Sequence, residues 1–195
     1  PQNIYKTVSH KQMKPNYTYQ NSSDFIEDLD FAYLETYSLQ RGQKFDDELE
    51  SLQSEFDNLN SRTDLNDVEK NRLKQIDELI NYVQFVIDKN GKLHFSATKT
   101  NRFEKNEAKS KLLIEILKTE VKNIADWMCA PIYRDAILFF NKNDDLINVL
   151  NICFSCERMA TKMYNQIEAD EKTYKLLRDF FSNIGHEIET ESASG

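Results

Sequence analysis

The sequence predicts an all-α protein, an antiparallel up-down bundle of four long helices. Two stretches carry apolar residues at alternating steps of three and four, a spacing that puts them on one face of an α-helix. Glycine and proline are scarce, with 4 and 3 among 195 residues, whereas sheet proteins need many turns that use both. These observations favour a spectrin-like or four-helix-bundle architecture. The two apolar series are Phe45, Leu49, Leu52, Phe56 and Leu59, then Leu73, Ile76, Ile80, Val83 and Ile87.

The first helix is expected over residues 24–60. Asp24 and Glu27 have the spacing of a capping box, in which two side chains satisfy free backbone N–H groups at a helix start. Gly42 lies inside this stretch and weakens a helix by about 1 kcal/mol relative to alanine. The first helix therefore either kinks or breaks into two at Gly42.

The second helix is expected over residues 66–89. Asn66 and Glu69 form a second candidate capping box at its start. Gly91 follows the last apolar position and fits a left-handed cap at the helix end. Residues 60–64 form a turn before this helix, and four long helices with short connections predict antiparallel neighbours.

Two further helices complete the expected bundle. The third begins near residue 104 and continues to 140, with either a kink or a restart at Pro131, which cannot donate a helical hydrogen bond. The last runs over 144–184, as one helix or as two that break near Asp170, which would cap a fifth helix.

One domain accounts for most of the chain. Residues 22–186 carry the helical pattern and form the expected bundle domain. Residues 1–21 are polar and lack acidic side chains, so we expect an extended or disordered N-terminal arm. Residues 187–195 are expected to be a flexible acidic tail.

Composition excludes several classes of function. The formal net charge is −8, which disfavours nucleic-acid binding because phosphate contacts need a basic surface. No run of 18 apolar residues is present that would span a membrane. Cys129, Cys153 and Cys156 are odd in number, which favours free thiols in a reducing compartment. We therefore expect a cytoplasmic protein, free or peripheral to a membrane or organelle.

The motifs indicate no cofactor and no metal. Cys153 and Cys156 form a C-x-x-C pair inside the expected last helix, where core packing is favoured over a redox or zinc role. A di-metal bundle enzyme needs Glu-x-x-His on two helices. His10, His94 and His186 do not have a glutamate three residues before them.

Charge is unevenly distributed, and this is the first lead to function. Acidic residues dominate the chain before residue 70, and basic residues gather between 92 and 122 with phenylalanines among them. The basic stretch predicts a docking patch for an acidic partner helix or for anionic lipid headgroups. The alternative is a solvated loop whose lysines pair with the acidic half. The patch consists of Lys92, Lys99, Arg102, Phe103, Lys105 and Lys109.

A second lead is an excess of apolar side chains around Pro131. Trp127 precedes this proline, and residues 132–140 would be apolar on nearly every face of a helix. A bundle buries one stripe, so Tyr133, Phe139 and Phe140 are predicted to meet a partner or a second copy of the chain. Trp127 is expected either at that surface or in the core.

The function that fits these patterns best is a non-enzymatic scaffold, adaptor or tether that binds other proteins through helical faces, also as a homodimer. One alternative is a peripheral membrane module that binds anionic lipid. Another is a helical enzyme with dispersed catalytic residues, for which Arg178 and His186 are the first pair to test. His186 follows Gly185 at the expected helix end, where interaction with the helix dipole is the simpler role.

Overall fold

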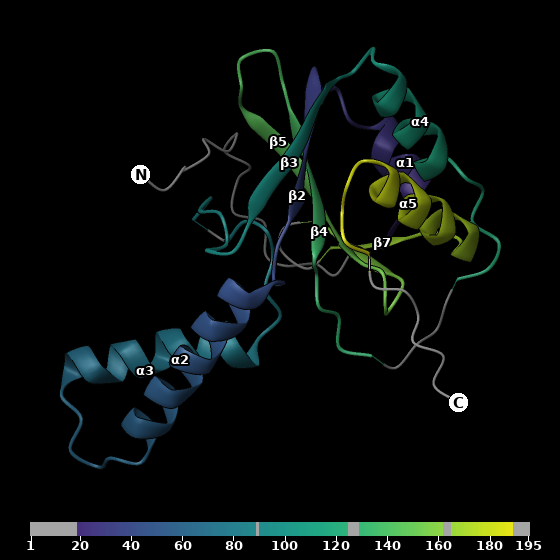
Figure 1. The fold of residues 1–195 in the computed structure, drawn as a ribbon. Coiled ribbons are helices and arrows are strands. Elements are labelled where there is room, and N and C mark those ends of the chain that lie inside the picture. The colour runs from purple at the N-terminus through teal and green to yellow at the C-terminus, as the bar shows by residue number, and fades with distance from the viewer. Residues whose placement is uncertain (1–18, 89, 125–128, 162–164, 189–195) are drawn as a thin grey trace.

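The computed structural model describes residues 19–88, 90–124, 129–161 and 165–188. It shows a mixed α/β fold, in which a seven-stranded, mostly antiparallel sheet is packed with helices (Figure 1). The expected all-α bundle, and with it a coiled-coil or spectrin-like architecture, is therefore wrong. The expected arm over 1–18 and most of the expected tail lie outside the described residues.

The sheet has the strand order β1-β7-β6-β5-β4-β2-β3. Strands β1 and β7 pair in parallel, and the other neighbours pair antiparallel. Strand β3 therefore forms one edge of the sheet and β1 the other. The strands are β1 (Gln20–Asn21), β2 (Tyr33–Ser38), β3 (Thr98–Glu104), β4 (Asp135–Phe140), β5 (Leu146–Cys153), β6 (Arg158–Ala160) and β7 (Gln166–Glu168).

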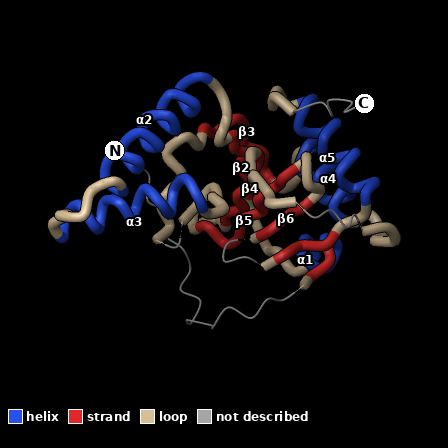
Figure 2. The backbone as a smooth tube through the Cα atoms, turned by 90° about the horizontal axis from the view of Figure 1, so that it is seen from below, coloured by secondary structure: helices blue, strands red, loops and turns tan. Residues whose placement is uncertain are grey.

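The helices fall into two groups. Helices α1, α4 and α5 lie together on one face of the sheet, whereas α2 and α3 form a hairpin that projects away from it (Figures 1 and 2). This separation gives the molecule a compact sheet-and-helix body and an outlying helical hairpin. The helices are α1 (Ser22–Glu27), α2 (Gln43–Asn60), α3 (Asp67–Asn81), α4 (Ala108–Leu117) and α5 (Glu171–Asn183).

The main core is formed by the strand side chains that point to the helix-covered face of the sheet. Side chains such as Leu34, Ile137 and Phe139 point from the sheet toward the helices and pack against Leu113 of α4 and Leu177 of α5. All five are fully buried. Successive strand residues point to opposite faces, so their neighbours must be covered from the other side.

The opposite face of the sheet is covered by a non-helical segment of the chain rather than by helices. The segment after α3 runs across it and inserts Val86 and Ile87 against Tyr37, Leu138 and Phe140. Because both faces are buried, β4 is apolar at nearly every position, a pattern typical of a central strand. The same apolar run suggested a helix covered by a partner, but its cover comes from within the chain.

Three of the expected helices are wrong over much of their length. The stretch expected as one helix from 24 contains only the short helix α1 before β2, the third contains β4 after α4, and the last contains β5, β6 and β7. Short apolar runs fit a helix or a buried strand equally well by spacing alone. Hydrogen-bonded pairing with strands that are distant in sequence decides whether such a run forms a helix or a strand.

Several helix boundaries are confirmed. Asn66 is the N-cap of α3, and its capping box with Glu69 is present. Gly42, with φ of 86°, is the N-cap of α2, so a helix begins at this glycine, although strand β2 rather than a helix precedes it. Asp170 caps α5 by accepting a hydrogen bond from the backbone N–H of Lys172, as the two-helix alternative predicts. Helix α3 ends earlier than expected, at Asn81, and Gly91 lies in a turn beyond it.

Candidate functional site

The helical hairpin, residues 43–81, is the most exposed structural feature of the chain. Helices α2 and α3 pack extensively on each other and have their own small core of Leu52, Leu59 and Ile76. Among the described residues, no helix is long and apolar enough to cross a membrane. With its own core, the hairpin packs as a separate unit that stands apart from the sheet (Figure 2). Most of its residues are exposed.

The hairpin carries most of the net negative charge of the chain. Residues 43–81 contain eleven acidic and five basic side chains. Some acids are paired within the hairpin, as Glu55 is with Arg72 at 2.6 Å and Glu69 with Arg62 at 2.6 Å. The hydrogen bond with Arg72 lowers the pKa of Glu55, and the backbone N–H of Asn66, followed by Arg62, lowers the pKa of Glu69. The first two turns of α2 are different, because their acids face solvent.

An apolar patch lies among those acids at the root of the hairpin. Phe45 and Leu49 are one turn apart on α2, and the ring of Phe45 stacks on Phe95 with centroids 5.8 Å apart. Leu49 and Phe95 are exposed. The ring of His94 packs beside Phe95 at 4.4 Å, and burial lowers the pKa of His94 to about 4. We call Phe45, Leu49 and Phe95 the root patch.

A buried polar network fixes the chain where the hairpin leaves the sheet. Arg41, just before α2, donates to the carboxylate of Asp135 at the start of β4, with Nη2 and Oδ2 2.7 Å apart. The same guanidinium also donates to the backbone carbonyls of Arg134 and Glu187. The other Asp135 oxygen, Oδ1, lies 2.6 Å from Nδ1 of His186.

The network continues from His186 to the edge strand β3. Nε2 of His186 lies 2.7 Å from the hydroxyl oxygen of Thr100. That hydroxyl also lies 2.7 Å from the hydroxyl of Thr36 and 2.9 Å from the Thr36 carbonyl oxygen, so its single proton goes either to that carbonyl or to Nε2 of His186. The side chains of His186 and Asp135 are 0% and 2% exposed, whereas Thr100 is an exposed residue. An acid, an imidazole and a surface hydroxyl are therefore hydrogen-bonded in series.

Three cations of the expected basic patch are engaged in ion pairs within the chain. Lys99 and Arg102 lie on β3, where Lys99 pairs with Glu35 at 3.2 Å and Arg102 with Glu104 at 3.2 Å. Lys105 pairs with Asp30 at 3.5 Å. Lysines on an edge strand also protect it from pairing with other sheets.

The other members of the expected patch lie on neighbouring segments. Lys92 lies in the segment that follows α3, and Lys109 lies on α4. Phe103 packs against the main core. Three of the expected cations thus form ion pairs within the chain, and the docking patch stays a prediction.

The expected partner-binding aromatics are buried within the chain. Phe139 and Phe140 are 0% and 1% exposed on β4. Tyr133 stacks on Phe85 with centroids 5.2 Å apart, and burial raises the pKa of Tyr133 to about 12. The chain itself therefore covers these side chains, and the homodimer stays a prediction. Trp127 lies outside the described residues.

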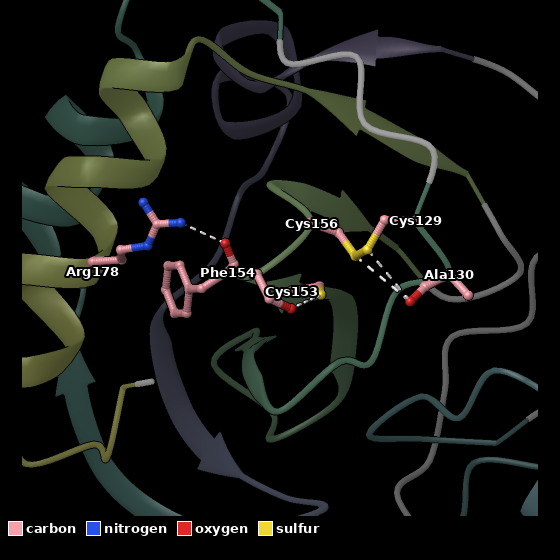
Figure 3. The surroundings of a disulfide bond; sticks show 7 residues. Cys129, Ala130, Cys153, Phe154, Cys156 and Arg178 are labelled. Carbon is pink, nitrogen blue, oxygen red and sulfur yellow. Dashed lines mark hydrogen bonds between the residues drawn. A yellow bond between two sulfur atoms is a disulfide. The ribbon is translucent and has the colours of Figure 1, made fainter. Parts of the chain in front are cut away.

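The cysteines depart from the expected free thiols. Cys129 and Cys156 form a disulfide with Cα atoms 5.9 Å apart, and only Cys153 is free (Figure 3). Cys153 and Cys156 lie at the turn between β5 and β6, not in a helix, and Cys153 is buried as expected. In the described part of the chain, no group of three His, Cys, Asp or Glu residues could hold a metal.

The network at Asp135 was missed by sequence reasoning, which put Arg178 on the last helix, where it lies, and named it with His186 as a pair to test. The guanidinium of Arg178 lies 2.6 Å from the carbonyl of Phe154 and 3.2 Å from Glu157, at the β5–β6 turn (Figure 3). It therefore does not form the pair expected with His186. The available signal for Asp135 was its position as the one acidic residue at the start of a very apolar run. Residue spacing alone does not connect Asp135 with His186.

Comparison with other proteins identifies no relative, so the function is inferred from the geometry of the structure. A scan against family models, a search of curated proteins and a search of solved structures each returned no match.

Proposed function

We propose that this chain is a protein-binding module that docks a basic, amphipathic segment of a partner on the root of its helical hairpin. The observation that carries this proposal is the root patch, a partly exposed apolar surface flanked by exposed acids. A helical or extended segment with apolar anchors and lysines or arginines on its flanks matches that chemistry.

The placement of the charges supports this choice of partner. On a helix with 3.6 residues per turn, Asp46 and Glu48 flank the line from Phe45 to Leu49 on its two sides. Asp46, Asp47, Glu48 and Glu50 are all exposed. The positive end of the helix dipole favours acids in the first turn. This local effect fades before Glu50, so the dipole does not account for the whole acidic collar.

The projection of the hairpin supports the same reading. Its packing is internal, so a partner could cover the root patch without displacing the sheet or its helices. Apolar anchors would supply affinity, and the acidic collar would raise the association rate and select against acidic partners. The proposed role of the hairpin is binding, without catalysis.

The test uses a fluorescent amphipathic leucine–lysine peptide as the probe. Binding is measured by fluorescence anisotropy at low and at physiological salt, because screening weakens interactions between exposed charges. The double substitution Asp46→Lys/Glu50→Lys should weaken binding at least about tenfold, equivalent to about 1.4 kcal/mol. Leu49→Ala should weaken it at both salt concentrations.

A matched control separates docking from general attraction to an acidic protein. Glu115→Lys/Asp179→Lys makes the same change in net charge on the exposed faces of α4 and α5. This control should bind the peptide as the unmodified chain does, within about twofold. Equal weakening by the two double variants would show that the hairpin root is not the docking surface.

A further inference from the structure

We propose that Thr100 is a nucleophile that accepts acyl groups from esters, with His186 as its general base and Asp135 as the positioning group. The sign of such a site is a hydroxyl within hydrogen-bond reach of a base that a third group orients. Here Oγ1 of Thr100 lies 2.7 Å from Nε2 of His186, and Nδ1 lies 2.6 Å from Oδ1 of Asp135. Both distances are in the range found for proton transfer between such groups.

The fold presents Thr100 in an irregular part of the sheet. Between β2 and β3, Thr36 pairs with Asn101 and Tyr37 with Lys99, so Thr100 is the extra residue of a β-bulge. A bulge redirects a side chain and is found often beside active sites. Because β3 is an edge strand and Thr100 is an exposed residue, the proposal places the substrate at this edge of the sheet.

The imidazole is held rigidly behind that hydroxyl. Gly185, with φ of 91°, turns the chain after α5 and brings His186 back over the sheet. The backbone N–H of His186 donates to the Phe181 carbonyl at 3.0 Å, and the ring packs edge-on against the Phe181 ring at 4.7 Å. The side chain of His186 is fully buried, and its Nε2 atom is hydrogen-bonded to Thr100, an exposed residue.

The hydrogen bonds set the direction of proton transfer. In the tautomer whose Nδ1 proton is donated to Asp135, the lone pair of Nε2 faces Thr100, and the Thr100 hydroxyl proton turns from the Thr36 carbonyl, 2.9 Å away, toward Nε2. Arg41 holds the second carboxylate oxygen at 2.7 Å. The hydroxyl of Thr36, 2.7 Å from the Thr100 oxygen, can donate to it and stabilise the charge that develops as the proton leaves.

The acyl transfer balances without a further reactant. The Thr100 oxygen attacks the ester carbonyl carbon, and its proton passes to Nε2 of His186. The bond from that carbon to the leaving oxygen then breaks, and the alcohol departs with the proton from His186. Water next attacks the Thr100 ester and gives its proton to His186. The carboxylic acid leaves, and the proton returns to the Thr100 oxygen.

The test uses p-nitrophenyl acetate with the whole chain. Mass spectrometry should locate an acetyl group on Thr100, and p-nitrophenol release should follow the same time course. Thr100→Val, which keeps the side-chain shape, should abolish the adduct, and Thr100→Ser should retain it. Thr98→Val, on the same exposed strand, is the matched control and should leave acetylation unchanged. Acetylation of the Thr100→Val chain at the unmodified rate would overturn the proposal.

A second measurement separates a base from a purely structural histidine without altering the fold. General-base catalysis predicts that the acetylation rate of the unmodified chain rises with pH and then reaches a plateau once the imidazole is neutral. His186→Gln should lower the plateau by about 100-fold or more. A rate that grows in proportion to hydroxide over the whole range would mean that Thr100 is not activated, and would overturn the proposal even if His186→Gln failed to fold.

Discussion

The imidazole of His186 and the carboxylate of Asp135 meet at 2.6 Å although 51 positions separate them in the sequence. One group follows the last helix and the other begins a central strand, so their contact ties the end of the described chain to the middle of the sheet. Arg41 joins the same carboxylate from the root of the hairpin. Three parts of the fold therefore depend on one buried acid.

The first prediction concerns that acid. Asp135→Ala should lower the free energy of unfolding by about 3 to 5 kcal/mol, because it leaves buried partner groups without their carboxylate. Urea titration monitored by circular dichroism measures the change. Asp179→Ala removes an exposed carboxylate from α5 and should change stability by no more than about 0.5 kcal/mol. Similar losses in both variants would contradict a stabilising role for the network.

The second prediction concerns the independence of the hairpin. Ile76 is fully buried in the small core that α2 and α3 share. Ile76→Ala should cost about 2 to 5 kcal/mol by removing buried methyl groups and leaving a cavity. The cost should fall on the hairpin, so amide exchange should accelerate in α2 and α3 while β4 and β5 keep their protection.

The matched substitution for Ile76→Ala lies in the sheet. Leu138 is equally buried on β4, where it packs in the second core. Leu138→Ala should accelerate exchange in the sheet and its helices together. Loss of protection across the whole molecule in Ile76→Ala would show that the hairpin and the sheet unfold as one unit.

The third prediction concerns pH. Burial lowers the pKa of His94 to about 4, against about 6.5 in an unfolded chain. Between these values the unfolded state binds the additional proton, so stability is full above pH 6.5 and falls as the pH drops toward 4. The loss is up to about 3 kcal/mol. Urea midpoints measured at intervals from pH 7 to about pH 4 test this slope.

His94→Gln should flatten that slope, because glutamine does not titrate. The paired carboxyls of Glu69 and Asp170, whose pKa values are lowered from ordinary values of 4.5 and 3.8, lose their contribution at still lower pH. Their effect is therefore distinguishable from that of His94. An unchanged slope in His94→Gln would place the acid sensitivity in another group.

The fourth prediction concerns the disulfide. Cys129 and Cys156 are 27 positions apart, and closing a loop of that length stabilises a fold by about 3 to 4 kcal/mol in the chain-entropy model. Dithiothreitol should lower the stability of the unmodified chain by that amount. It should have no further effect on Cys129→Ser. Loss of the reductant effect in Cys153→Ser would instead make Cys153 a member of the bond.

Part of the fold was predictable because it is local. The hairpin helices follow from amphipathic spacing, and the capping box of Asn66 and Glu69 follows from their separation by one helical turn. Asp170 and Gly42 mark helix starts because a cap and a positive-φ glycine act on their own neighbours. The acidity of the hairpin is visible in the sequence in the same way.

The sheet was not predictable from spacing. Phe139 and Phe140 fit a wide apolar helix as well as a strand, and burial of both strand faces removed the alternation that would have distinguished them. The partners of β4 are β2, about 100 residues earlier, and β5, which follows it. Such pairing depends on contacts that no local window contains.

The candidate sites divide along the same line. By itself, the sequence determined the apolar stripe and acids of α2, because a helix repeats every 3.6 residues and its neighbours on one face are close in sequence. Only the tertiary structure decided that Asp135, His186 and Thr100 are hydrogen-bonded in series. They come from a strand, a turn after a helix and a bulge, and only packing of the whole sheet brings these three segments together.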